Sequence, residues 1–213
     1  MTRRYSLFLS LIVIFFEHSV QARTQTTLDY ESRIHPEIAD DFMVVSQNKH
    51  ATEAGYEILK KGGNAIDASV AVGFALAVTL PRAGNLGGGG FILIYDKDKD
   101  EVSSIDYRSA APKSATSDLF LNGDQVVRFG HLVNAVPGSV AGLLKAHEDY
   151  GTLPLSELLK PAIRLARDGF EVTYDLNFVL EWGKESMLAN PSSKNKFYES
   201  SGDPIKVKSN FIQ

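Results

Sequence analysis

A run of glycines followed by two apolar segments constrains this chain more than any other feature. Residues 84–90 read GNLGGGG, and an apolar segment, 91–95, follows at once. Five charged residues, 96–100, separate it from a second apolar segment, 102–107, which ends on Arg108. This order predicts a loop, a strand, a tight turn and a second strand. Adjacent glycines lose much conformational entropy on folding, so we expect them where backbone passes very close to a ligand or to another piece of backbone, or where it adopts a positive φ.

Arg108, at the end of this predicted hairpin, is the candidate binding residue. A guanidinium can donate two parallel N–H···O bonds to a carboxylate, so an arginine beside a glycine loop can hold an anion. The alternative is a structural ion pair, for instance with Asp106 or Asp67. Residue type alone favours the ion pair.

No nucleophile with an obvious base can be identified from the pattern. Ser69, Ser109 and Ser139 are candidate hydroxyls, but a Ser/His/Asp triad cannot be assembled from the spacing. His50 precedes a predicted helix and is more typical of a capping or packing residue than of a base. Asp67 lies near the start of the next predicted helix, where a carboxylate suits the helix dipole. The residues by themselves therefore support an exported α/β domain with an anion-binding arginine, and no named reaction.

Composition argues against several classes of function. The net charge is −4, and no basic cluster interleaved with aromatic residues suggests nucleic-acid binding. The absence of cysteine excludes disulfides and thiolate metal sites, and no two histidines are spaced i, i+4 as in a zinc-binding helix. The glycine loop lacks the Gly-Lys-Ser/Thr ending of a phosphate-binding loop, because Phe91 follows Gly90. We therefore expect no metal and no cofactor.

Periodicity predicts a mainly helical chain around the hairpin. The segment 65–78 is small or apolar on all sides, so we expect that helix to be buried on most of its surface. The other helices are expected at 50–61, 140–150, 154–167 and 171–186, with a short one at 114–120, a first strand at 43–46, and a loop or edge strand at 124–132.

The N-terminus has the pattern of a secretory signal peptide over residues 1–22. An arginine pair at 3–4 precedes an apolar segment, 7–16, and small residues at the −3 and −1 positions, Val20 and Ala22, suit cleavage before Arg23. The apolar segment is too short to span a bilayer. The alternative is an uncleaved N-terminal anchor. We expect an exported protein, in a bacterial periplasm or outside the cell, and the lack of cysteine fits a bacterial envelope.

Several segments together resemble the large-subunit half of γ-glutamyltransferase, also called γ-glutamyltranspeptidase or glutathione hydrolase. They read GGNAIDASVAVGFALAVTLPRAGNLGGGGF, IDYRSAAP and VPGSVAGLLKAHEDYGTLPLSELLKPAIRLARDGFEV, and they occur in the family's order. The resemblance runs from Met43 to Val172, and residues 173–213 are compatible but less specific. It divides the chain into a signal peptide (1–22), a leader (23–42) and a partial large-subunit domain truncated at its C-terminus (43–213).

The resemblance implies a fold and a reaction. The fold is α+β, an N-terminal-nucleophile hydrolase-like αββα sandwich that is incomplete here. Members of the family are precursors that cut themselves in two. The new N-terminal threonine of the small subunit attacks the γ-glutamyl carbonyl of glutathione or another γ-glutamyl compound. The resulting acyl-enzyme passes the glutamyl group to water or to an amino acid or peptide acceptor.

The resemblance also assigns a role to one residue. In the family motif [D/N]-[F/Y/A]-R the arginine binds the α-carboxylate of the glutamyl group, and the matching residues here are Asp106, Tyr107 and Arg108. Two departures stand out. Ser109 occupies a position where many members carry glutamate, and the threonine-threonine processing motif is absent. We therefore expect no catalytic residue in this chain, a missing small subunit as its partner, and no activity from the 213 residues alone.

Two other interpretations stay open. A related acylase that removes glutaryl side chains from β-lactams would share the same motifs, although the surroundings of Arg108 favour an amino-acid substrate. A non-catalytic remnant, or a binding protein for γ-glutamyl compounds, would keep the binding residue and lack the nucleophile.

Overall fold

The computed structural model describes residues 37–119, 121–122, 125–126, 130 and 133–213. The chain divides into two units at residues 40 and 41, and the second, Asp41–Gln213, carries every element described below. The predicted signal peptide lies outside the described residues, as does the leader up to residue 36. Among the described helices, none is long and apolar enough to cross a membrane.

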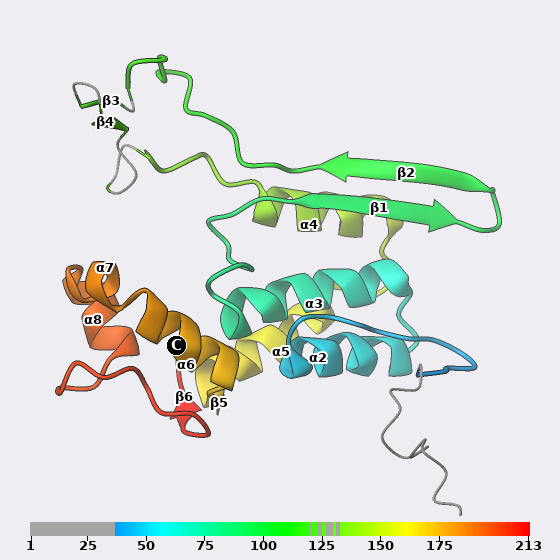
Figure 1. Cartoon of the computed structure of the whole chain (residues 1–213). Helices are drawn as coiled ribbons and strands as arrows, with labels where there is room; N and C mark the ends of the chain where they lie inside the picture. Colours follow the sequence, from blue (N-terminus) through cyan, green and yellow to red (C-terminus); the bar gives the residue numbers. More distant parts are fainter. Residues whose placement is uncertain (1–36, 120, 123–124, 127–129, 131–132) are drawn as a thin grey trace, which may run out of the picture. The chain divides into compact units, whose positions relative to one another are not determined.

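Helices and short antiparallel strand pairs make up the second unit (Figure 1). The helices are α2 (Lys49–Lys60), α3 (Ala65–Thr79), α4 (Ser139–Tyr150), α5 (Leu155–Asp168), α6 (Tyr174–Trp182), α7 (Lys184–Leu188) and α8 (Pro191–Phe197). The strands are β1 (Phe91–Asp96), β2 (Glu101–Asp106), β3 (Leu121–Asn122), β4 (Gln125–Val126), β5 (Phe170–Glu171) and β6 (Asn210–Phe211). They pair as β1–β2, β3–β4 and β5–β6, each antiparallel.

Helix α3 is the centre of the helical part, because it packs against α2, α4 and α5. Its all-round apolar sequence is buried on most sides, as predicted, and Val70, Ala71 and Ala75 are inaccessible to solvent. Its small buried residues let the neighbouring helices approach closely, and burying a larger side chain such as Val70 contributes about 1.5–3 kcal/mol. The main core cluster consists of Ile58, Ala68, Val70, Ala71, Leu143, Ala146 and Leu158.

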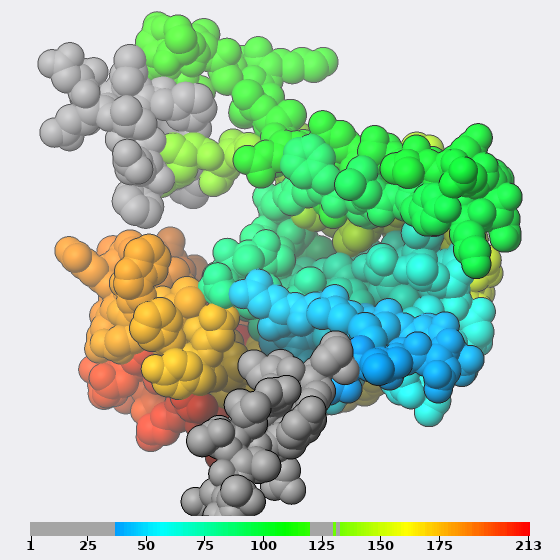
Figure 2. Space-filling view, turned by 45° about the vertical axis from the view of Figure 1, so that its right-hand side comes forward, coloured from blue at the N-terminus to red at the C-terminus, as the bar shows by residue number. Residues whose placement is uncertain are grey.

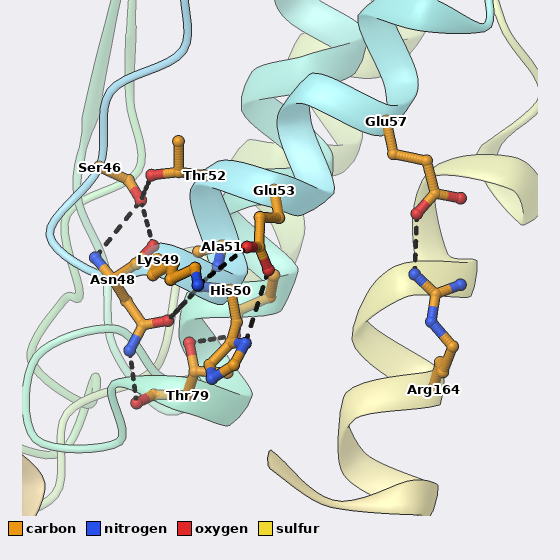
Figure 3. A network of polar contacts seen from close by, with 11 residues as sticks. Ser46, Asn48, Lys49, His50, Ala51, Thr52, Glu53, Glu57, Thr79 and Arg164 are labelled. Atoms are coloured by element: carbon orange, nitrogen blue, oxygen red, sulfur yellow. Dashed lines mark hydrogen bonds and ion pairs between the residues drawn. The ribbon is translucent and has the colours of Figure 1, made fainter. Parts of the chain in front are cut away.

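Asparagine caps fix where the first two described helices begin. The Asn48 side-chain oxygen accepts the backbone N–H groups of His50 (2.9 Å) and Ala51 (3.4 Å), so α2 begins at Lys49. The Asn48 amide also donates to the Thr79 carbonyl (3.4 Å), which ties the start of α2 to the end of α3 (Figure 3). Asn64 caps α3 in the same way. Such caps satisfy N–H groups that a helix leaves unpaired at its start.

The predicted hairpin is present, with Phe91 opposite Asp106 and Asp96 opposite Glu101. Side chains alternate between its two faces. Ile92 and Ile105 pack against the main core cluster, whereas the other face exposes large apolar side chains, with Leu93 78% accessible. The exposed side chains of that outer face are Phe91, Leu93, Tyr95 and Val102.

The C-terminal region differs from the single helix predicted over 171–186. Phe170 and Glu171 form β5, and Thr173 then caps α6 by accepting the Leu176 N–H (3.2 Å). Gly183 ends α6 and begins α7, so two short helices replace one. An aromatic and aliphatic core holds this part together: Phe170, Val172, Leu176, Leu180, Tyr198 and Phe211.

Three other local predictions have separate outcomes. Residues 43–46 form no strand; an added methyl on Gly55 would lie 2.9 Å from the Val44 side chain, so this segment packs on α2 and joins no sheet. Turns replace the short helix expected at 114–120, of which residue 120 is not described. Of 124–132, residues 125–126 form β4 and most of the rest lies outside the described residues.

Candidate functional site

The glycine loop, residues 84–90, packs against other backbone. The Gly88 carbonyl accepts the N–H groups of Gly138 (2.8 Å) and Ser139 (3.0 Å), at the start of α4. A methyl group added at Gly89 would overlap the backbone nitrogen of Ser109 and lie 2.6 Å from the Tyr107 carbonyl oxygen. None of the loop glycines has a positive φ, so glycine is needed here for space. Of the explanations considered for the glycine run, the close approach of backbone to backbone is the one observed.

Hydrogen bonds fix the backbone on both sides of Arg108. Before it, the N–H of Tyr107 donates to the Gly90 carbonyl (3.0 Å), and the Gly90 N–H donates back (3.3 Å). After it, Ala110 and Val136 exchange two bonds of 3.1 and 2.8 Å. The N–H of Arg108 itself donates to the Asp106 carboxylate (2.8 Å). The Cα of Arg108 therefore lies between two fixed points.

The side chain of Arg108, by contrast, is free within the part of the chain that the structure describes. Arg108 is exposed, and no described residue forms an ion pair or a side-chain hydrogen bond with it. Of the two ion-pair partners considered from the sequence, Asp106 accepts a backbone N–H, and Asp67 is bonded elsewhere. The binding role of the guanidinium stays a prediction, and no described partner competes for it.

Asp67 is a structural carboxylate, as its place at a helix start suggested. It is fully buried and completes a capping box with Asn64. It also accepts the hydroxyl of Thr152 (2.5 Å), the N–H of Thr152 (3.0 Å) and the N–H of Leu153 (3.3 Å). Burial alone would raise the pKa of Asp67, but the bonds from Thr152, Asn64 and Leu153 outweigh it and hold the pKa below its ordinary value. The carboxylate joins the start of α3 to the segment between α4 and α5.

The remaining candidate side chains show no catalytic arrangement among the described residues. The Ser69 hydroxyl donates to the Ala65 carbonyl of its own helix (2.8 Å), and no described base bonds to Ser109 or Ser139. The His50 ring lies edge-on to Phe170, with ring centres 6.0 Å apart, which fits packing. In the described part of the chain no group of three histidine, aspartate or glutamate side chains could hold a metal ion.

A hollow of about 600 Å³ lies between α3 and the hairpin, next to Tyr107. In Figure 2 the green hairpin and the blue N-terminal segment of the second unit lie on either side of it. Its lining is mainly apolar and includes Ser69, Val72, Leu76, Ile92 and Leu143. Partial burial raises the pKa of the Tyr107 phenol.

Sequence reasoning did not identify the residues that surround Tyr107. Gly142 falls inside the helix predicted over 140–150 and Gly138 lies two residues before it, yet both lie directly against Tyr107. The one sequence pattern that points to this contact is the spacing of four residues between the two glycines, which places both on one face of a helix and so allows both to contact the same residue.

Comparisons with known proteins agree over most of the chain. The family model described as gamma-glutamyltranspeptidase matches residues 51–213. The glutathione hydrolase proenzyme of Escherichia coli (strain K12) is 44% identical over 188 residues, which cover 86% of this chain and 32% of that protein. Two solved structures are similar. The γ-glutamyltranspeptidase of Helicobacter pylori has a TM-score of 0.79 and 38% identity, and the match covers 84% of this chain and 52% of that one. The cephalosporin acylase of Bacillus halodurans has a TM-score of 0.68 and 26% identity, covering 87% and 37%. The chain spans about a third of the length of the curated relatives it matches.

Proposed function

Because this chain belongs to the γ-glutamyltranspeptidase family, we propose that it is the N-terminal part of a glutathione hydrolase precursor and that it holds the γ-glutamyl donor. Its fold is accordingly the α+β fold of the N-terminal-nucleophile hydrolases, as the resemblance implied. Family membership supports the reaction class. The geometry at the end of β2 supports the part that this chain plays in it.

The observation that carries the proposal is an exposed guanidinium on a fixed backbone. Arg108 has no described ion-pair partner, while the residues on both sides of it are hydrogen-bonded to Gly90 and Val136. The α-carboxylate of a glutamyl group is always charged at neutral pH, and a two-bond grip fixes its orientation as well as its charge. Holding that end of the donor sets where the γ-carbonyl lies relative to the nucleophile.

The bond chemistry belongs to residues outside this chain. In the proposed precursor, a threonine hydroxyl attacks the γ-carbonyl, the amide C–N bond breaks and the amine leaves with a proton. Water or an acceptor amine then cleaves the ester and releases the glutamyl group. A nucleophile of this kind needs an adjacent base, and the described residues offer none to Ser69, Ser109 or Ser139. The residues of this chain therefore bind and orient.

The partner that we propose is the remainder of the same precursor. The outer face of the hairpin exposes Phe91, Leu93, Tyr95 and Val102, and both of its strand edges are unpaired among the described residues. Exposed apolar faces and open edges are covered in stable proteins. We further propose export through residues 1–22, a leader over 23–42 and a large-subunit domain over 43–213, acting in a bacterial periplasm or outside the cell.

The test uses the complete reading frame that contains this chain and a matched pair of donors. We expect hydrolysis of γ-glutamyl-p-nitroanilide and much slower hydrolysis of 4-aminobutyryl-p-nitroanilide, which lacks the α-carboxylate. Arg108→Lys should impair the first reaction and leave the second unchanged. Arg167→Lys, at an exposed arginine on α5, is the control and should change neither. Equal rates on both donors, or full activity in Arg108→Lys, would contradict the proposal.

A second candidate is supported by the likeness to the cephalosporin acylase. A glutaryl group also ends in a carboxylate that Arg108 could bind, but it has no α-amino group. Glutaryl-p-nitroanilide therefore separates the two reactions, because only an acylase should prefer it over the γ-glutamyl compound. Tight binding of glutamate without turnover of any of these donors would instead indicate a binding protein.

A further inference from the structure

Tyr107 lies in a seat formed by three glycines, Gly90, Gly138 and Gly142. A methyl group added at Gly142 would overlap the Tyr107 Cβ and Cγ atoms, and one at Gly138 would overlap the Tyr107 carbonyl oxygen. A methyl group at Gly90 would lie 2.8 Å from the Tyr107 hydroxyl oxygen and 2.9 Å from its ring. The tyrosine therefore occupies space that side chains would fill at any residue other than glycine. We call these three residues the glycine seat.

A glycine at position 142, inside α4, is unfavourable for the helix by itself. Glycine inside a helix is about 1 kcal/mol less stable than alanine. Gly142 is buried and is the fourth residue of α4, and its N–H already forms the helical bond to the Gly138 carbonyl (2.8 Å), so no cap calls for glycine there. The contact with Tyr107 is the feature that requires it.

Helix α4 is also held at its far end, so it cannot shift freely to relieve a clash. The Asn64 amide donates to the Tyr150 carbonyl (2.6 Å), and Asp67 binds Thr152 and Leu153 just beyond the helix. His147 bonds to the Leu153 carbonyl (2.7 Å). At its near end the helix is bonded to the glycine loop through Gly138 and Ser139. The seat is therefore a rigid surface on which the end of β2 rests.

We propose that Tyr107 is a positioning residue, which sets the direction in which Arg108 presents its guanidinium to the carboxylate of the donor. This inference rests on the proposed function. The Tyr107 ring and carbonyl are fixed by the seat, its N–H is bonded to Gly90, and the next peptide leads directly to Arg108. Two parallel hydrogen bonds to a carboxylate require a fixed orientation of the guanidinium. A rotation of the backbone at residue 107 would therefore weaken donor binding without affecting the nucleophile.

The first experiment adds one methyl group to the seat in the complete precursor. Gly142→Ala should raise KM for γ-glutamyl-p-nitroanilide by about tenfold or more and change kcat by less than about threefold, since a small misplacement suffices. KM for 4-aminobutyryl-p-nitroanilide should not change, because that donor has no carboxylate to orient. Gly55→Ala is the matched control: it is a buried glycine inside α2, and its added methyl meets the ends of the Val72 and Val44 side chains instead. It should leave both KM values unchanged.

A second set of variants empties the seat without adding atoms, in case Gly142→Ala folds poorly. Tyr107→Ala should raise KM for the γ-glutamyl donor as Gly142→Ala does, whereas Tyr107→Phe keeps the ring and should restore the normal value. Combining Tyr107→Gly with Gly142→Ala should be no worse than Tyr107→Gly alone, because the added methyl then has room.

The outcomes separate this inference from the proposed function. A wild-type precursor that turns over no γ-glutamyl donor would refute the proposed function. A precursor that is active and sensitive to Arg108→Lys, but whose KM is unchanged in Gly142→Ala and Tyr107→Ala, would refute the positioning role alone. A lower melting temperature in both variants without a change in KM would show that the seat is only structural, and would also refute it.

Discussion

Asp67 at the start of α3 and Arg108 just after β2 are both charged, but their surroundings are opposite. Asp67 is completely buried and accepts hydrogen bonds from Asn64, Thr152 and Leu153. Arg108 is exposed, and its guanidinium bonds to no described residue although the backbone around it is fixed. A buried charge must be satisfied inside the protein, whereas an unpaired charge on a rigid support is available to a ligand. Asp67 is accordingly a residue for stability and Arg108 a residue for binding.

The largest expected effect is on catalysis, from Arg108→Lys in the complete precursor. Lysine keeps the charge but lacks the planar pair of donors. We expect kcat/KM on γ-glutamyl-p-nitroanilide to fall by an amount equivalent to about 2–4 kcal/mol of transition-state stabilisation, the scale for a donor carboxylate that is left poorly paired. The melting temperature should stay within about 1 °C of wild type, because surface changes rarely alter stability. Steady-state kinetics measure kcat/KM and a thermal melt measures the melting temperature. A large loss of stability with unchanged kinetics would show that Arg108 serves stability and not binding.

The opposite result is expected for Asp67→Ala. Removing the buried carboxylate leaves the partly buried N–H groups of Asn64, Thr152 and Leu153 without their acceptor. We expect a loss of about 3 kcal/mol of unfolding free energy, since each unsatisfied buried donor costs about 1–3 kcal/mol. Urea titration followed by circular dichroism measures it. Asp98→Ala, at an exposed aspartate in the hairpin turn, is the control and should change the stability by less than about 0.5 kcal/mol.

The sequence predicted the helix that carries Asp67, but not the distant residues that contact Asp67 or Tyr107. Asn64, Asp67 and the small apolar residues after them indicated a capped and buried helix, and α3 begins and ends within a residue of the prediction. The bonds that saturate Asp67 come from residues 85 and 86 positions away, so no local pattern could reveal them. The same holds for the glycine seat, where Gly142 and Tyr107 meet only through the packing of α4 on the hairpin.

The hairpin and the C-terminal region also show that the sequence predicts local patterns and not contacts between distant residues. Two apolar segments separated by five charged residues predicted β1 and β2, because the pattern of a hairpin is local. Helical periodicity over 171–186 was a misleading signal, since Thr173 and Gly183 divide that stretch. The pairing of β5 with β6 joins Phe170 to Phe211, and two-residue strands carry no periodic pattern that could announce them.

A smaller effect is expected from pH, and it concerns Asp67 alone. Its pKa in the folded protein lies below the ordinary value of 3.8, because the hydrogen bonds from Thr152, Asn64 and Leu153 outweigh the effect of burial. A lowered pKa contributes stability that is fully present above the unfolded-state value and is lost as the pH falls towards the folded-state value. The free energy of unfolding should therefore decline below about pH 4.

Other carboxylates, Glu57 among them, also have lowered pKa values, so the informative quantity is the difference in unfolding free energy between wild type and Asp67→Asn. That difference should shrink as the pH falls; a constant difference would show that the charge of Asp67 is not what the bonds stabilise.

The smallest effect separates the hydroxyl of Thr152 from its backbone. Thr152→Val keeps the shape and the N–H bond to Asp67 but removes the 2.5 Å bond from the hydroxyl. We expect a loss of about 1–2 kcal/mol of unfolding free energy, since bonds to charged groups exceed neutral ones and the carboxylate keeps its backbone donors. Thr116→Val is the control, at a threonine in the loop after the hairpin with no hydrogen bond to a buried charge among the described residues.

Thr152→Val also tests whether the two charged residues are independent, because Asp67 holds the far end of α4 and a shift of α4 could change donor binding at Arg108. KM for the γ-glutamyl donor should change less than twofold, because the N–H groups of Thr152 and Leu153 still hold the carboxylate in place. A KM change as large as that of Gly142→Ala would mean that binding and stability are coupled through α4, and that the two charged residues are not independent.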